Sequence, residues 1–104
     1  MMQFSYPDAD SIGEGEMRPI KVEERSLLLI RHQGNLHCID NRCGHFGAPL
    51  VTGSVEDGAI HCSLHQIAFS LHSGEVVTDT SNKCSPITVY PVVEQGGEAV
   101  IDLC

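Results

Sequence analysis

The sequence lacks several features that would define other classes of protein. It contains no Trp, two Tyr and three Phe among 104 residues, so its core must be built mainly from Val, Ile and Leu. No apolar run approaches the roughly 18 residues of a membrane-spanning helix, and the first residues show neither the basic start nor the apolar stretch of a secretion signal. We therefore expect a cytoplasmic protein that does not contact a membrane.

Basic residues are also scarce. Six Lys and Arg stand against 14 Asp and Glu, which gives a formal net charge of −8. Such a balance argues against binding to nucleic acid and favours a soluble protein that meets a basic partner. The length allows one domain, residues 1–104, without room for the separate substrate chamber of a large enzyme.

No stretch keeps a helical apolar period of 3.6 residues for three turns, so long amphipathic helices are not expected. Short β-branched and aliphatic runs alternate with turn signals instead. Residues 26–32 and 36–40 predict a hairpin around a turn at 33–35. Further strands are predicted at 59–62, 67–70, 75–77, 87–93 and 99–103. The expected fold is all-β, with antiparallel hairpins packed as small sheets or a partial barrel.

The cysteines are few and odd in number. They are Cys38, Cys43, Cys62, Cys84 and Cys104. This set fits a complete disulfide framework poorly and a reduced compartment with a metal site better. Cys43 and His45 stand at one predicted hairpin tip, and Cys62 and His65 at another. Two such loops side by side would present two thiolates and two imidazoles.

Three interpretations compete for these four residues. Isolated Cys and His in a small β domain are mostly packed or solvated side chains, but here they come in two pairs, each on a turn. A structural zinc site normally uses Cys-x2-4-Cys and His-x3-5-His pairs, and Cys-x-His followed by Cys-x2-His breaks that pattern. In the third interpretation, two cysteines hold one iron of a [2Fe-2S] cluster and two histidines hold the other. Alternating ligand types suit this binuclear centre, because each loop then reaches both irons.

The pattern Cys-x-His-x16-Cys-x2-His resembles that of the Rieske ferredoxins, small electron carriers that serve multicomponent oxygenases. The resemblance covers nearly the whole chain. Its other matching positions are Glu14–Glu16, Ile39–Arg42, Gly47–Leu50, Gly53–Glu56, Phe69, Ser73–Glu75 and Tyr90–Val92. The resemblance implies Rieske-like antiparallel sheets with a cluster-binding subdomain of two ligand loops, at about 41–51 and 61–70.

The resemblance also implies the ligands and the role. Cys43 and Cys62 would ligate the inner iron of one [2Fe-2S] cluster per chain, and His45 and His65 the outer, more exposed iron. The chain would not be an enzyme. It would carry single electrons from a flavin-dependent reductase to a terminal oxygenase or similar acceptor, through a small interface around His45, Phe46 and His65. We expect a monomer.

Acidic residues near the predicted loops could steer a basic partner, although solubility explains any single one equally well. They are Asp40, Glu56, Asp57 and Glu75. An alternative role is that of a non-catalytic accessory subunit, like the small Rieske-like partner of assimilatory nitrite reductases. Such subunits often lack the ligands, so the intact set favours the electron carrier.

The chain departs from the family pattern in three places. Family members commonly have Pro-aromatic after the second Cys and Gly after the second His, where this chain has Ser63-Leu64 and Gln66. Residues 78–84 lack the Gly-Pro pair usual in the third loop. High-potential relatives add a cysteine in each loop and a Ser that donates to a sulfide, at places that match Ala48, Leu64 and Ile67 here. The resemblance therefore implies a low potential for a Rieske centre.

The remaining cysteines and histidines are not expected to be ligands. Cys38 alternates with its neighbours in a strand and should be a small core or sheet residue. Cys104 is terminal, and Cys84 lies in the third loop with an open role. The four other histidines, without a second ligand at metal spacing, should have surface or ordinary polar roles; they are His32, His37, His61 and His72.

Overall fold

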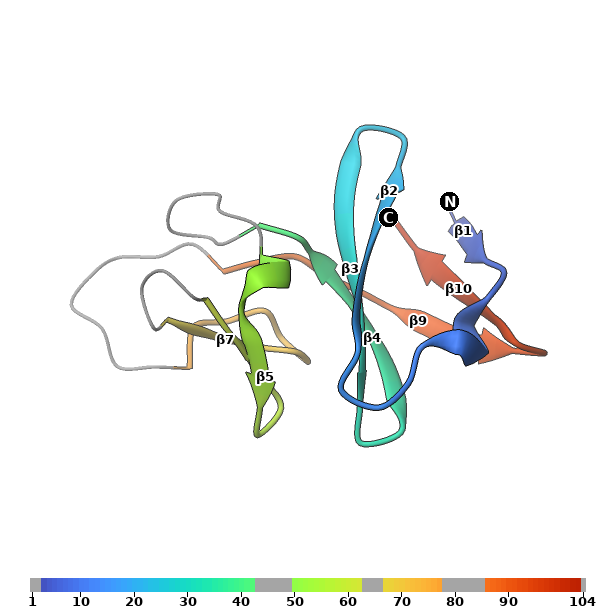
Figure 1. Ribbon diagram of the computed structural model, residues 1–104. Helices are drawn as coiled ribbons and strands as arrows, with labels where there is room; N and C mark the ends of the chain where they lie inside the picture. Colours follow the sequence, from blue (N-terminus) through green and yellow to red (C-terminus); the bar gives the residue numbers. More distant parts are fainter. Residues whose placement is uncertain (1–2, 43–49, 63–66, 78–85, 104) are drawn as a thin grey trace.

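The computed structural model describes residues 3–42, 50–62, 67–77 and 86–103, and over these ranges the chain is built from strands (Figure 1). The elements are β1 Gln3–Tyr6, η1 Ala9–Ser11, β2 Met17–Val22, β3 Arg25–His32, β4 Asn35–Asp40, η2 Leu50–Thr52, β5 Ser54–Glu56, β6 Ala59–His61, β7 Ala68–Ser70, β8 Val89–Tyr90, β9 Val92–Gln95 and β10 Glu98–Asp102. The two η elements are 3-10 turns. Within the described ranges, no helix is long and apolar enough to cross a membrane.

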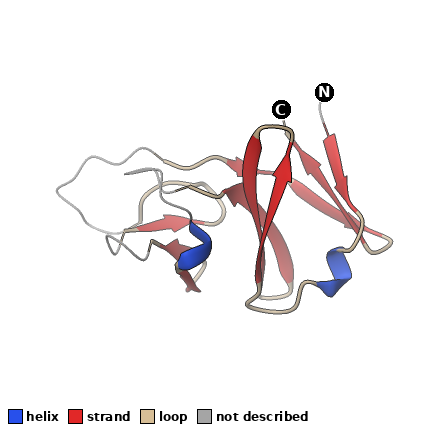
Figure 2. Ribbon diagram, turned by 45° about the horizontal axis from the view of Figure 1, so that its top comes forward, coloured by secondary structure: helices blue, strands red, loops and turns tan. Residues whose placement is uncertain are grey.

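The strands form three antiparallel sheets. The central sheet has the order β2-β3-β4-β8, the terminal sheet β1-β10-β9, and the short-strand sheet β5-β6-β7. The two views of the ribbon place the central sheet between the other two (Figures 1 and 2). The all-β prediction is therefore confirmed.

Strand β3 is an inner strand of the central sheet, and both of its faces are buried because each faces one of the two cores. Leu27, Leu28, Leu29 and Ile30 are all fully buried. Successive side chains of a strand point to opposite faces, so Leu28 and Ile30 join one core and Leu27 and Leu29 the other. This position explains why β3 reads as a continuous apolar run and does not alternate with polar residues.

The first core lies between the central sheet and the short-strand sheet. Its buried members are Leu28, Ile30, Ile39, Leu50, Ile60, Cys62, Ile67, Phe69, Leu71 and Ile87. The second core lies between the central and terminal sheets, with buried members Ala9, Ile12, Val22, Leu27, Leu29, Leu36, Cys38, Ala99, Ile101 and Leu103. With Phe69 as the one fully buried aromatic side chain among the described residues, packing rests on aliphatic groups, as the composition predicts.

Three hairpins have two-residue turns in which both residues take positive φ. These turns are Gln33-Gly34, Asp57-Gly58 and Gly96-Gly97. Positive φ at both positions is typical of the type I′ turn, whose twist matches that of the flanking strands. The predicted turns are confirmed, except that Asn35 belongs to β4 and not to the turn.

Two predicted strands differ from the observed ones. Residues 87–93 do not form one strand, because Pro91 has no N–H to donate to a ladder. The chain changes sheets there, so that β8 pairs with β4 and β9 pairs with β10. Residues 75–77 form a single bridge, Phe69 with Val76, and no strand.

Candidate metal centre

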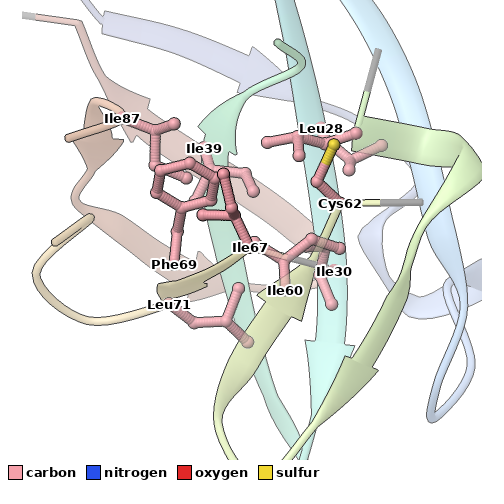
Figure 3. Packing of buried hydrophobic residues seen from close by; sticks show 10 residues of the cluster. Leu28, Ile30, Ile39, Ile60, Cys62, Ile67, Phe69, Leu71 and Ile87 are labelled. Atoms are coloured by element: carbon pink, nitrogen blue, oxygen red, sulfur yellow. The ribbon is translucent and has the colours of Figure 1, made fainter. Parts of the chain in front are cut away.

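Cys62 is fixed at the end of the β6–β7 hairpin. His61 is the last residue of β6 and pairs with Ala68 at the start of β7. The ladder continues one step further, because the Cys62 N–H donates to the Ile67 carbonyl at 2.8 Å. The Cys62 side chain is 3% exposed and belongs to the first core, as Figure 3 shows. The hairpin therefore holds this sulfur in place at the margin of an apolar core.

The two ends of the segment 43–49 are held together by Asn41. The Asn41 side-chain oxygen accepts a hydrogen bond at 3.0 Å from the N–H of Val51, which lies in η2 beyond the segment. The Asn41 N–H in turn donates to the Ser26 carbonyl at 2.9 Å. Asn41 thus closes the base of the first predicted ligand loop and ties it to β3.

Asp40, one residue earlier, is anchored as well. The Tyr90 hydroxyl donates to an Asp40 carboxylate oxygen at 2.7 Å. Burial raises the pKa of Tyr90 to about 12, and the hydrogen bond to Asp40 adds to the rise. The hydroxyl therefore stays protonated and able to donate at physiological pH. This bond joins β8 to the end of β4, where the first predicted loop begins.

The residues that follow the first loop lie directly against β6. A Cβ on Gly53 would overlap the His61 carbonyl oxygen, so only glycine permits this approach. The Gly53 N–H donates to the Leu50 carbonyl at 2.9 Å and closes the η2 turn. The end of the first loop is therefore packed against the backbone immediately before Cys62.

A third segment, 78–85, starts at the same end of the short-strand sheet. The Val77 N–H donates to the Ala68 carbonyl at 2.9 Å. In the sheet register, Ser54 pairs with His61 and His61 pairs with Ala68, so these residues lie side by side across the sheet. The short-strand sheet thus gathers at one end the residues that flank all three loops expected around the cluster.

The structure describes one of the four predicted ligands, Cys62, while Cys43, His45 and His65 lie outside the described residues. Over the described ranges, no group of three or more His, Cys, Asp and Glu side chains is arranged to hold a metal ion. Cys62 fits a thiolate ligand, because its sulfur is free and shielded from water.

Cys38 has the core role that its strand position predicts. It is fully buried in the second core, on the opposite face of the central sheet from the first core. Burial raises the pKa of its thiol to about 12, with a smaller contribution from Asp40. Among the described residues, Cys38 belongs to no group of His, Cys, Asp and Glu side chains that could hold a metal ion. Cys84 and Cys104 lie outside the described residues.

Sequence reasoning missed a grouping of histidines. His32, His37 and His72 were expected to be separate polar residues, but their rings lie together, with centroids 6.5 Å apart for His32 and His37 and 5.2 Å apart for His37 and His72. The hairpin pattern contained part of the signal, since a turn at 33–34 puts His32 and His37 on one face. His72 lies in the turn after β7, and no local pattern predicts its contact with His37.

The comparisons with known proteins agree with this arrangement. The Rieske [2Fe-2S] domain family matches residues 4–92. The ferredoxin subunit of the 3-phenylpropionate/cinnamic acid dioxygenase of Escherichia coli K12 is 34% identical over 101 residues, covering 96% of this chain and 92% of that protein. The ferredoxin component of a naphthalene 1,2-dioxygenase system of Pseudomonas aeruginosa is 33% identical over 96 residues, covering 88% and 86%.

Solved structures share the fold. The Sphingomonas yanoikuyae B1 ferredoxin has a TM-score of 0.85 and 25% identity, over 99% of this chain and 100% of that one. A putative NADH-dependent nitrite reductase small subunit from Mycobacterium tuberculosis has a TM-score of 0.82 at 19% identity, over 96% and 93%, which shows a common fold alone.

The chain is an all-β iron–sulfur domain protein by its sheets and by its family match. It belongs to the Rieske [2Fe-2S] domain family, and its similarity to ferredoxin components of oxygenase systems extends over nearly its whole length. Its role is that of an electron carrier and not of an enzyme.

Proposed function

We propose that residues 1–104 form a single Rieske domain that holds one [2Fe-2S] cluster through Cys43, His45, Cys62 and His65. The observation that carries this proposal is the position of Cys62, shielded at the end of the sheet where the flanking residues of all three loops meet. Two thiolates and two imidazoles are the donor set of a Rieske centre. When bound, the cluster supplies reversible one-electron chemistry.

The described residues support an orientation of the site. Cys62 is 3% exposed and packs with Ile60 and Ile67 in the first core, so the sulfur side of the site is closed to water. We assign Cys43 and Cys62 to this inner side and the two histidines to the outer side. Electrons then enter and leave through the imidazole edges, because a partner can come close to the cluster only on the side that the apolar core does not cover.

The partners that we propose are a flavin-dependent reductase and a terminal oxygenase. Support comes from the relatives, which are ferredoxin parts of dioxygenase systems. The contact surface would centre on His45, Phe46 and His65. Val77 could add an apolar contact, since it is 56% exposed and its N–H donates to the carbonyl of Ala68, which follows the second predicted loop.

Charge would favour a basic partner through the net charge of −8. Glu56, Asp57 and Glu75 are exposed and contribute to this charge, but they lie at the β5–β6 turn end of the short-strand sheet, away from the loops, so they act only at long range. Asp40 differs, because its carboxylate is half-buried and accepts the hydrogen bond from Tyr90. We assign Asp40 to the support of the first loop.

The alternative role of an accessory subunit is supported only by the fold that the chain shares with the nitrite reductase small subunit. The retained set of two cysteines and two histidines favours the electron carrier, because an interaction module has no need of metal ligands.

We further propose that the carrier is a cytoplasmic monomer. The buried Cys38 and Cys62 are both free thiols, which suits a reducing compartment.

The midpoint potential tests the electron-carrier proposal. Ile67 is buried and has no hydroxyl, so it cannot donate to a sulfide where high-potential relatives have Ser. Fewer donors leave the reduced, more negative cluster less stabilised. We expect a midpoint in the lower part of the Rieske range of about −150 to +300 mV, and below about +100 mV.

A potentiometric titration of the purified protein measures this value. As a matched control, Ile67→Val removes one methylene group without adding a donor, and its midpoint should stay at that of the wild type. A midpoint potential well above about +100 mV would contradict the assignment to the low-potential group.

A further inference from the structure

Three histidines meet at the seam between the β3–β4 hairpin and the short-strand sheet. His32 ends β3, His37 lies in β4, and His72 lies in the turn after β7. The ring centroids of His37 and His72 are 5.2 Å apart, with the planes at 84°, and those of His32 and His37 are 6.5 Å apart. His37 pairs with Ile30 across the hairpin, which puts the cluster on the face of the first core.

His32 also bonds across the seam. The N–H of Gly58, in the turn between β5 and β6, donates to His32 Nε2 at 3.1 Å. This nitrogen accepts only while it carries no proton, because both ring nitrogens of a protonated histidine are donors. Protonation at Nε2 would replace the hydrogen bond with two opposed N–H groups.

His37 is half-buried, and its ring lies near both of the other two. Its pKa is lowered by burial first, and then by the charges that His72 and His32 would carry. The neutral ring is therefore the form that the folded protein favours. If two of these rings became charged, like charges would face each other across the seam at the distances given above.

Other charged groups around the cluster do not neutralise His37. Glu14 faces His32, and its carboxylate accepts hydrogen bonds from the Gln33 and Gly34 N–H groups at 2.6 and 2.8 Å. Arg31 precedes His32 and binds Glu94. The carboxylates on the opposite side of the seam are Glu56 and Asp57, ahead of Gly58, and Glu75, after His72. None of these groups contributes to the shift in the pKa of His37.

A metal site would be another use for three histidines. Among the residues that the structure describes, however, no group of three His, Cys, Asp or Glu side chains is placed to hold a metal ion. The hydrogen bond from Gly58 also occupies His32 Nε2. Protonation is therefore the chemistry that this cluster supports.

We propose that His32, His37 and His72 form an acid-sensitive latch, which closes the seam between the β3–β4 hairpin and the short-strand sheet when neutral and weakens it when charged. The short-strand sheet carries Cys62 and the flanking residues of all three loops. Acidification would then loosen the support of the metal centre through residues that are not its proposed ligands. The latch goes beyond the electron-carrier function and does not depend on it.

The direction of the pH effect follows from linkage. The pKa of His37 is lower in the folded chain than the value of about 6.5 in an unfolded one. As the pH falls below that value, the unfolded state binds more protons than the folded state, so stability decreases. The contribution of the neutral His37 ring is complete above about pH 6.5 and is lost on the acid side.

Thermal unfolding of the cluster-containing protein, followed by far-UV circular dichroism at about pH 8 and about pH 5.5, tests the latch on either side of the ordinary histidine pKa. The variants are His37→Gln and His72→Gln, each of which keeps a polar side chain that cannot be charged. We expect the fall in apparent Tm between the two pH values to be smaller in each variant than in the wild type, by at least about 4 °C. His72 is exposed, so its variant tests the latch even if the His37 variant does not fold.

Lys21→Gln is the matched control, because Lys21 is exposed on β2 in another part of the central sheet and its loss removes one positive charge. Its fall in apparent Tm should equal that of the wild type. An equal fall in the wild type and both histidine variants would overturn the latch. So would a Lys21 variant that is protected as well as the histidine variants. Iron content is measured at both pH values to keep two outcomes apart. Absence of iron would count against the proposed cluster, whereas an equal fall in Tm in the wild type and the histidine variants would count against the latch.

Discussion

Cys62→Ala is expected to yield a folded, colourless protein that retains almost no iron. The sulfur of Cys62 is free and 3% exposed, and among the described residues Cys62 is the one cysteine in the first core. The methyl group of Ala has no donor to offer in its place. Loss of a supporting partner of a metal ligand already costs about 10- to 100-fold in affinity, so loss of the ligand should cost at least as much.

Cys38→Ala is the matched control, because it removes an equally buried thiol from the second core. Removing one buried sulfur should by itself cost about 1 kcal/mol of stability at either position. Only the Cys62 variant should lose iron, and with it the stability that the bound cluster adds. Iron and sulfide are measured after purification without air, and far-UV circular dichroism checks the fold. A Cys62 variant with the iron content of the wild type would contradict the assignment of this ligand.

Gly74→Ala is expected to cost about 3 kcal/mol of unfolding free energy, from about 1 to 2 for the backbone conformation and a similar amount for steric overlap. Gly74 has a φ of 77°, in the left-handed region that L residues avoid. A Cβ at this position would also overlap the Ile87 carbonyl oxygen. This oxygen belongs to the backbone, so it cannot move away without shifting the chain. The Ile87 N–H already donates to the Gly74 carbonyl at 2.9 Å, so the two segments cannot separate freely.

Two other glycines separate these causes. Gly34 has a φ of 80° and open space where a Cβ would lie, so Gly34→Ala should cost only about 1 kcal/mol, from its backbone conformation. Gly13 has neither constraint, and Gly13→Ala should change stability by less than about 0.5 kcal/mol. Urea unfolding followed by circular dichroism gives the three values. Equal losses at Gly74 and Gly34 would show that the contact with Ile87 is unimportant.

The hairpins were predictable from sequence because their turns carry local signals. Pairs such as Asp57-Gly58 and Gly96-Gly97 specify a backbone conformation by themselves, whatever they later pack against. Strands without such signals were missed at Gln3–Tyr6, Met17–Val22 and Ser54–Glu56. All three lie at sheet edges, where pairing on one side and partial exposure leave a weak apolar pattern. Pro19 further weakens the strand signal of β2, because proline argues against a central strand, although it is compatible with an edge strand.

Residue type and spacing make Cys43, His45, Cys62 and His65 candidate ligands, and the family resemblance selects the iron–sulfur interpretation among them. The structure describes only Cys62 of these four, so the set stays a prediction. The contacts that support the loops were not predicted. Two of these contacts are the close approach of Gly53 to the His61 carbonyl and the hydrogen bond that the Val51 N–H donates to the Asn41 side chain. In both, the neighbours in sequence give no hint of the partner. The meeting of His72 with His37 is of the same kind. Such contacts join residues that are distant in sequence and depend on the tertiary arrangement, which a local pattern cannot encode.

The electron paramagnetic resonance spectrum of the reduced wild-type protein, purified without air, tests whether the chain holds a Rieske cluster. We expect a rhombic signal typical of a [2Fe-2S] cluster with mixed cysteine and histidine ligands, in a sample with about two irons and two sulfides per chain. A reduced protein that gives no signal and contains zinc would rule out the cluster and the electron-carrier function, and would leave only the three-sheet fold.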